Sequence, residues 1–232
     1  MYLYNLEHGV NNAFYSTIQR GYQNIQYINE FPPFVARSVY LQYGKQKESL
    51  NVLDPCAGWG GRMIGCASVP NTTYIACEPS TETYNGLLKL GEWLKTLQPT
   101  FNYRVYKLPY EDFESDEKFD VALTSPPYYN TEHYSDEPTN SMNRYNTYEK
   151  WVDGFYKPLI VNTLKRLKDD GVFILNVGDR KYPLSNSMYK ICEDESLFCE
   201  RIRDYLSGNG EGKEKFYCIS KHRTIAQRKK LF

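Results

Sequence analysis

The sequence predicts a doubly wound α/β domain, in which helices cover both faces of a mostly parallel sheet that ends in an antiparallel hairpin. Three observations lead to this class. Short apolar runs of strand length alternate with segments of helical periodicity between residues 34 and 177. Glycine or proline follows several of these runs, and the last two runs flank a turn-rich segment. Strands that alternate with helices pair in parallel through right-handed crossovers.

The elements follow one another in a regular order after Pro32-Pro33, where proline suits a first helical turn. In chain order we expect a helix over 34–41, a strand over 50–54, a helix over 63–67, a strand over 73–78, a helix over 81–97, strands over 103–106 and 119–124, a helix over 148–167, a strand over 172–177 and hairpin strands over 197–206 and 215–220. We expect one domain, with an unassigned extension over 1–31, a core over 32–221 and a basic tail over 222–232.

The composition limits the classes of function. Lys and Arg total 28 and Asp and Glu total 28, so the net charge gives no long-range attraction to phosphate, and a nucleic acid would need a local patch. The 22 tyrosines suit a wet surface that stacks on bases, although compositional drift in an AT-rich genome explains them equally well. The six cysteines lack metal-ligand spacing, so we expect no metal. Without a long apolar run or a signal peptide, we expect a soluble, cytoplasmic protein and no membrane partner.

A glycine-rich turn directly follows the strand over 50–54 and reads Asp-Pro-Cys-Ala-Gly-Trp-Gly-Gly-Arg from Asp54. Open α/β sheets bind ligands at the carboxyl ends of their strands, and glycines let the backbone approach a nucleoside closely. No Lys-Ser/Thr pair follows, as a phosphate-binding loop requires, and a carboxylate suits a cofactor with sulfonium and ammonium charges. The candidate cofactor residues here are Asp54, Cys56, Gly58 and Gly60.

Two further acids are candidates for the same site. Glu78 ends the strand over 73–78, 20 residues after Gly58, at the spacing where a carboxylate accepts hydrogen bonds from ribose hydroxyls. The alternative, a strand end that faces solvent, is less favoured beside such a turn. Asp112 could accept from an adenine amino group, and an ordinary loop acid is an equally good interpretation.

The tetrapeptide Ser125-Pro126-Pro127-Tyr128 follows the strand over 119–124 and carries the clearest chemical signal. Two prolines present the preceding carbonyls rigidly as acceptors. The Ser125 hydroxyl and the Pro126 carbonyl could then hold the N–H groups of an aromatic amine and direct its lone pair toward a methyl donor. Tyr128 is placed to stack on the base, which must be flipped out of a duplex. A structural turn is the alternative interpretation.

Taken together, these motifs resemble the S-adenosylmethionine-dependent amino-methyltransferases of DNA over residues 32–221. The resemblance implies a Rossmann-like, seven-stranded methyltransferase sheet and S-adenosylmethionine as cofactor. The implied cofactor residues are Phe34, Asp54, Gly58, Gly60 and Glu78, and the implied amine-binding residues are Ser125, Pro126, Pro127 and Tyr128. Serine in the first of these four positions is similar to the cytosine-specific enzymes and therefore favours cytosine over adenine.

The chain departs from that family in one respect, because no large target-recognition region is present. The longest candidates are residues 1–31 and a Tyr-rich stretch over 129–147, which we expect to form a mobile cover that favours single-stranded substrates. DNA is the favoured partner. The same chemistry on RNA, on a modified nucleotide or on a protein amide stays open, as does a catalytically silent subunit that binds nucleic acid. Size and composition suggest an origin in a phage or mobile element.

Overall fold

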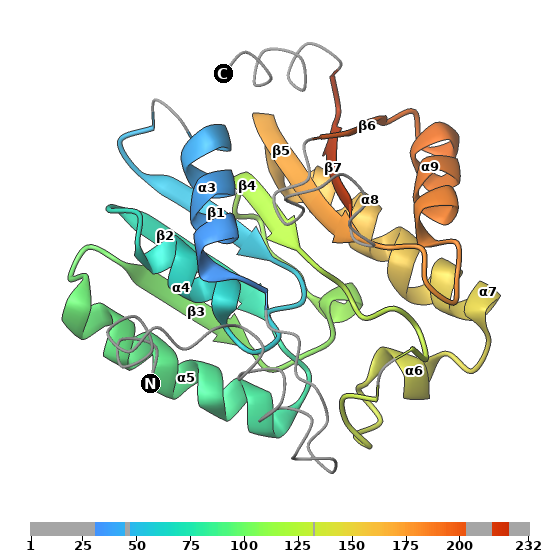
Figure 1. The fold of residues 1–232 in the computed structure, drawn as a ribbon, viewed down its shortest axis with the longest axis horizontal. Helices are drawn as coiled ribbons and strands as arrows, with labels where there is room; N and C mark the ends of the chain where they lie inside the picture. Colours follow the sequence, from blue (N-terminus) through green and yellow to red (C-terminus); the bar gives the residue numbers. More distant parts are fainter. Residues whose placement is uncertain (1–30, 45–46, 132, 203–214, 223–232) are drawn as a thin grey trace, which may run out of the picture.

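The computed structural model describes residues 31–44, 47–131, 133–202 and 215–222. Within these ranges the chain forms a seven-stranded sheet in the order β3-β2-β1-β4-β5-β7-β6 (Figure 1). The strands are β1 (Leu50–Asp54), β2 (Thr72–Cys77), β3 (Asn102–Tyr106), β4 (Phe119–Thr124), β5 (Leu167–Val177), β6 (Phe198–Arg201) and β7 (Lys215–Ser220). Only β7 runs antiparallel to its neighbours β5 and β6. The predicted class, a mostly parallel sheet with an antiparallel C-terminal pair, is confirmed.

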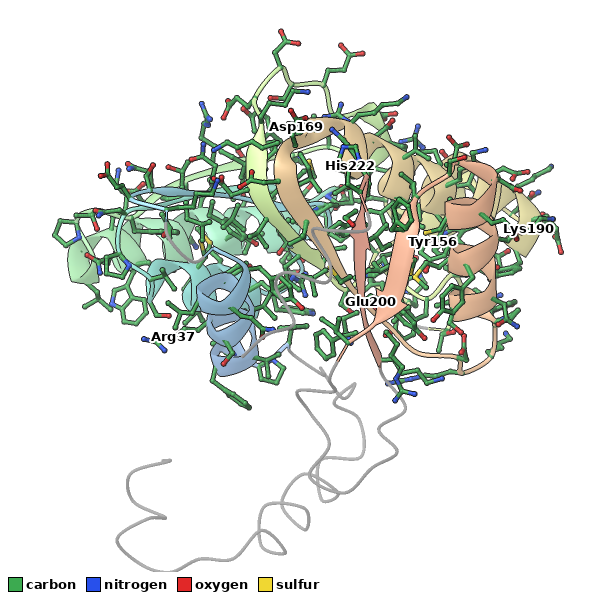
Figure 2. The ribbon with its side chains drawn as sticks, turned by 90° about the horizontal axis from the view of Figure 1, so that it is seen from above. Arg37, Tyr156, Asp169, Lys190, Glu200 and His222 are labelled. Carbon is green, nitrogen blue, oxygen red and sulfur yellow. The ribbon has the colours of Figure 1, made fainter. Side chains whose placement is uncertain are left out.

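Helices cover both faces of this sheet. The helical elements of the described ranges are α3 (Pro33–Tyr43), α4 (Gly61–Ala67), α5 (Thr81–Leu97), η1 (Tyr110–Asp112), α6 (Ser141–Arg144), α7 (Tyr148–Trp151), the π-helix η2 (Val152–Tyr156), α8 (Lys157–Arg166) and α9 (Leu184–Asp194). Figure 2 shows Arg37 and Lys190, both exposed, on the outer sides of α3 and α9. The buried apolar residues form two clusters, one on each face of the sheet.

The strand sequences explain the two clusters, because successive residues of a strand point to opposite faces. On β1, Val52 belongs to the apolar cluster beneath α3, α4 and α5, and Leu53 belongs to the cluster beneath α8 and α9. On β5, Ile174 and Phe173 divide in the same way. Strands that are apolar on both sides are typical of a parallel sheet covered by helices.

The structure differs from the predicted elements at three places. The single helix predicted over 148–167 is divided into α7, η2 and α8, and the π-helical turn directs both Phe155 and Tyr156 to the buried ring of Trp151 (centroid distances of 5.1 and 5.2 Å). Helix α9 was not predicted, although Leu184, Met188 and other apolar residues line its buried face. The strand predicted over 197–206 is described only as β6, since residues 203–214 lie outside the described ranges.

The remaining expectations concern membranes and cysteines. None of the helices in the described part of the chain combines the length and the apolar character that a membrane span requires. All six cysteines are free thiols, and four of them are buried: Cys66, Cys77, Cys192 and Cys218.

Candidate functional site

The glycine-rich turn and the Ser-Pro-Pro-Tyr segment come together where the strand order reverses. From β1 the chain continues outward to β2 and β3, and it then crosses to β4 on the other side of β1. The loops after β1 and β4 therefore leave the same edge of the sheet side by side, at the point where open α/β sheets bind ligands. The glycine-rich turn begins at Asp54 on the first of these strands, and Ser125 follows the second.

The glycine-rich turn depends on backbone conformations that favour glycine. Gly58 and Gly60 have φ angles of 57° and 98°, in the left-handed region. A Cβ atom on Gly60 would lie 2.4 Å from a methyl carbon of Leu90, so the Leu90 side chain would also have to shift. At Gly58 an added Cβ would meet no atom closer than 3.8 Å, and this open space leaves room for a ligand against the backbone.

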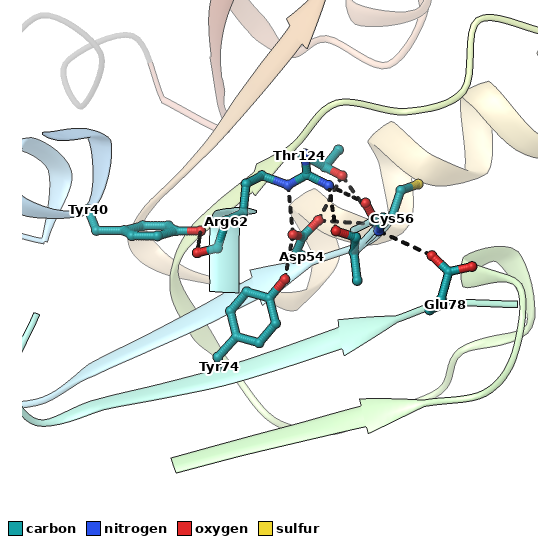
Figure 3. A network of polar contacts seen from close by, with 9 residues as sticks. Tyr40, Asp54, Cys56, Arg62, Tyr74, Glu78 and Thr124 are labelled. Carbon is teal, nitrogen blue, oxygen red and sulfur yellow. Dashed lines mark hydrogen bonds and ion pairs between the residues drawn. The ribbon is translucent and has the colours of Figure 1, made fainter. Parts of the chain in front are cut away.

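Asp54 lies fully buried beneath this turn, and the chain itself occupies its carboxylate (Figure 3). One oxygen accepts hydrogen bonds from Arg62 Nε (2.7 Å) and the Tyr74 hydroxyl (2.6 Å). The other accepts from Thr124 Oγ1 (2.9 Å) and Cys56 N (3.3 Å). Since a carboxylate offers about four lone-pair sites, Asp54 holds the turn and has little capacity left for a cofactor.

Arg62, which was not among the predicted site residues, holds the turn together from within. Its guanidinium pairs with Asp54 and donates to the carbonyls of Cys56 and Ala57, at 3.1 Å for the latter. Burial disfavours the charged form, but the Asp54 carboxylate together with Tyr74 and Tyr40 outweighs it, and the pKa of Arg62 is raised. Burial also raises the pKa of the Cys56 thiol, which keeps that predicted cofactor residue neutral. No spacing rule connects an arginine after a glycine turn with a buried ion pair, so no signal in the sequence indicates this role of Arg62.

Glu78 follows β2 at the same edge and faces the glycine turn. Its carboxylate accepts from Gly58 N (3.1 Å) and Ser80 N (2.9 Å), and only 8% of the residue is exposed. Burial raises the pKa of Glu78 to about 7, and the two backbone hydrogen bonds oppose this rise. Gly58 and Glu78, which lie 20 residues apart in the sequence, are thus in direct contact. A desolvated acceptor in this place suits ribose hydroxyls.

We expect Glu78→Ala to weaken the binding of S-adenosylmethionine by about 10- to 150-fold, because hydrogen bonds to a charged acceptor contribute about 1.5 to 3 kcal/mol. The wild-type affinity should also depend on pH. The pKa of about 7 lies above the ordinary carboxyl value, so the ionised acceptor forms only as the pH rises through 7. Affinity should therefore increase about tenfold from pH 6 to pH 8.

Isothermal calorimetry on both proteins at both pH values measures these effects. The alanine variant is the control for the titration of the cofactor's own amino group, and its affinity should lack the contribution of Glu78 to the pH dependence. Equal affinities for the two proteins at pH 8 would rule out the ribose contact.

Ser125, Pro126, Pro127 and Tyr128 leave β4 at the edge that the glycine turn also occupies. Pro126 is buried, while Ser125 and Pro127 are half-buried. Tyr128 is 7% exposed, and the guanidinium carbon of Arg180 lies 5.6 Å from its ring centroid. The predicted stacking face of this tyrosine is therefore covered by a cation in the structure.

The stretch over 129–147, predicted to be a mobile cover, is attached to the body of the protein at several points. Glu137 accepts from the backbone N (2.8 Å) and hydroxyl (2.9 Å) of Thr81, at the first residue of α5. Arg144 binds Asp112 through two hydrogen bonds of 2.7 and 3.2 Å and also contacts Glu111. Both oxygens of Asp112, a predicted adenine acceptor, are thus engaged by an arginine.

Phe34, a predicted cofactor residue, and Trp59 of the glycine turn are both exposed. Phe34 is 67% exposed in the first turn of α3, and this helix packs tightly on α4: a Cβ on Gly65 would lie 2.6 Å from Pro33 O. Trp59 in the glycine turn is 51% exposed. The predicted basic tail lies outside the described residues from 223 onward, as do residues 1–30. In the described ranges no cluster of His, Cys, Asp and Glu could hold a metal ion.

No family model matches this chain. Among solved structures it resembles an rRNA methylase from Streptococcus thermophilus (TM-score 0.52, 10% identity, 84% of this chain and 99% of that chain). It also resembles the TYW2 protein of P. horikoshii in complex with MeSAdo (TM-score 0.51, 14% identity, 87% and 67% of the two chains). The chain therefore has the Rossmann-like, seven-stranded fold of these methyltransferase structures, as the sequence predicted.

The name of one curated relative states both a substrate and the atom that is methylated. The chain is 26% identical over 139 residues to a tRNA1(Val) (adenine(37)-N6)-methyltransferase of a Flavobacteriaceae bacterium (strain 3519-10), which covers 59% of this chain. The chain spans about half the length of that relative (55%). Of the three proteins described here, two have names that state a substrate, and both names state RNA. The expected relationship to DNA enzymes finds no support in them, and the RNA alternative agrees with them better.

Proposed function

We propose that this chain transfers the methyl group of S-adenosylmethionine to an exocyclic amino group of a base in RNA. One observation carries the proposal. Thr124, the residue before Ser125, donates to Asp54 Oδ1 (2.9 Å) and accepts from Cys56 N (3.2 Å). This contact joins the glycine turn, where a nucleoside cofactor fits, to the Pro-Pro segment, where an amine fits. Donor and acceptor would therefore be held in one rigid frame.

The residues present suit the cofactor. Glu78 offers a buried carboxylate for ribose hydroxyls, and the open space beside Gly58 admits a nucleoside against the backbone. The structural neighbour that binds MeSAdo, an adenosine derivative, adds support for this use of the fold. When bound, S-adenosylmethionine supplies an electrophilic methyl group. Asp54 and Arg62 would then act on the shape of the turn rather than on the cofactor itself.

The amine would be held by the segment after β4. The Ser125 hydroxyl and the Pro126 carbonyl would accept the two N–H groups of the amine, so that its lone pair points toward the methyl donor. Such catalysis relies on orientation and fixed dipoles and needs no covalent intermediate. Tyr128 would stack on the base once the guanidinium of Arg180 has left its ring.

Adenine is the base that the tRNA-modifying relative favours, and we propose adenine N6 first. Cytosine N4 is the second candidate, because Ser125 stands in the first position of the Pro-Pro tetrapeptide. Both bases present an amino group on an aromatic ring, and the segment after β4 could hold either of them.

Mass analysis of nucleosides tests the proposal. RNA and DNA are incubated with the protein and S-adenosylmethionine, digested, and compared with samples that lack the protein. N6-methyladenosine or N4-methylcytidine from RNA supports the proposal and distinguishes the two bases. The methylated deoxynucleosides alone would restore DNA as the substrate, and binding of the cofactor by calorimetry without any product would favour a silent subunit.

A further inference from the structure

The loop between β5 and α9 is fastened to the segment that follows Pro127. Lys181 Nζ and the Tyr182 hydroxyl both donate to Asn130 Oδ1, at 3.0 and 2.8 Å. The ring of Tyr182 also packs edge-on against Tyr129, with centroids 5.1 Å apart. These three contacts fix the position of the loop, so Arg180, the residue before Lys181, is held beside Tyr128.

Arg180 is exposed to solvent, yet its guanidinium lies over the ring of Tyr128, 5.6 Å from the centroid. A guanidinium is flat and weakly hydrated, and it stacks on aromatic faces much as a base does. It therefore covers the face on which the proposed base would stack. A base can reach this face only if the arginine moves away.

The loop that carries Arg180 places two cations side by side next to the segment that follows β4. The one acid beside it in the loop, Asp179, accepts hydrogen bonds from the backbone N (2.8 Å) and the hydroxyl of Ser185 at the start of α9, and it lies 3.7 Å from Lys215. Its charge is thus compensated within the protein. Arg180 and Lys181 are two adjacent cations beside the base-binding segment, in a chain whose net charge is zero.

We propose that Arg180 is a substrate-positioning residue that exchanges the ring of Tyr128 for a phosphate group of the substrate. In the free protein the guanidinium covers the ring. When the target base stacks on Tyr128, the guanidinium leaves and binds a phosphate next to that base, as arginine binds phosphate through paired hydrogen bonds. Entry of the base and binding of the backbone are thereby coupled. This inference rests on the proposed function, and it identifies the substrate as a polynucleotide rather than a free nucleoside.

The test compares Arg180→Ala and Arg180→Lys with the wild type, and Lys190→Ala on the outer side of α9 serves as the charge-matched control (Figure 2). Fluorescence anisotropy with a labelled single-stranded RNA is recorded at several salt concentrations. We expect Arg180→Ala to bind about tenfold more weakly, with a salt dependence smaller by about one phosphate contact. Arg180→Lys should retain the salt dependence, and Lys190→Ala should behave as wild type.

Steady-state kinetics of methyl transfer to the same RNA provide a second measurement, of KM and kcat. Arg180→Ala should raise KM and change kcat by less than about threefold, as expected for lost substrate binding. An Arg180→Ala variant with wild-type affinity, salt dependence and KM would overturn the inference, as would an Arg180→Lys variant with the reduced salt dependence of Arg180→Ala. A wild-type protein that transfers no methyl group to RNA would contradict the proposed function, whereas the binding data would still decide the role of Arg180.

Discussion

Replacing Asp54 with Asn is expected to lower the free energy of unfolding by about 3 to 5 kcal/mol, because it leaves the buried charge of Arg62 without its partner. The substitution also places an NH2 group among side chains and a backbone N–H that all donate to the carboxylate. For a domain of this size the melting temperature should fall on the order of 10 °C. Thermal unfolding followed by circular dichroism measures this change.

Asp170→Asn is the matched control for this experiment. Asp170 also pairs with a cation, Lys47, but its side chain is 58% exposed, so the loss should remain below about 1 kcal/mol. Similar melting temperatures for the two variants would mean that the buried pair of Asp54 and Arg62 contributes no more to stability than an exposed pair does. The proposed frame that joins Asp54 to Thr124 would then lose its support.

The second large effect concerns Tyr128. We expect Tyr128→Ala to reduce kcat/KM for methyl transfer by about 5- to 150-fold, since a stacking face contributes about 1 to 3 kcal/mol per base. Cofactor affinity should remain within about twofold of wild type, because the contacts proposed for the ribose involve Glu78. A tritium-transfer assay and calorimetry measure the two quantities separately.

Tyr128 is largely buried, so its removal also costs packing, and two further variants separate the effects. Tyr128→Phe keeps the ring and should retain most of the activity. Tyr128→Leu fills much of the space without an aromatic face, and it should be nearly as impaired as the alanine variant. Wild-type turnover by Tyr128→Leu would show that the target base binds elsewhere.

Much of the fold could be predicted from local patterns. Alternating apolar runs and helical segments show where the strands and helices lie along the chain, because a strand buried on both faces and a helix buried on one face have different periodicities. The glycines of the turn and the acid after β2 were predicted for a similar reason: a left-handed backbone and a strand-end position are local properties. The π-helical turn that divides the helix over 148–166 left no such signal. Neighbouring aromatic residues are buried on both sides of this turn, so the sequence does not show where the helical period changes.

The partners of the polar residues could not be predicted in this way. Asp54 appears in the sequence as an acid available to a cofactor, but Arg62, Tyr74 and Thr124 meet it only when three strands and a helix have packed together. A carboxylate binds whichever donors surround it, and sequence spacing records none of those from distant segments.

The same holds for the segments around the proposed substrate. Arg144 lies 32 residues from Asp112 in the chain, and Arg180 lies on the loop after β5, far in sequence from Tyr128. The local sequence indicates which residues have the chemistry for nucleoside and amine binding. Only the tertiary structure decides which of them are already occupied by the protein, because ion pairs and stacked rings are chosen by proximity in space.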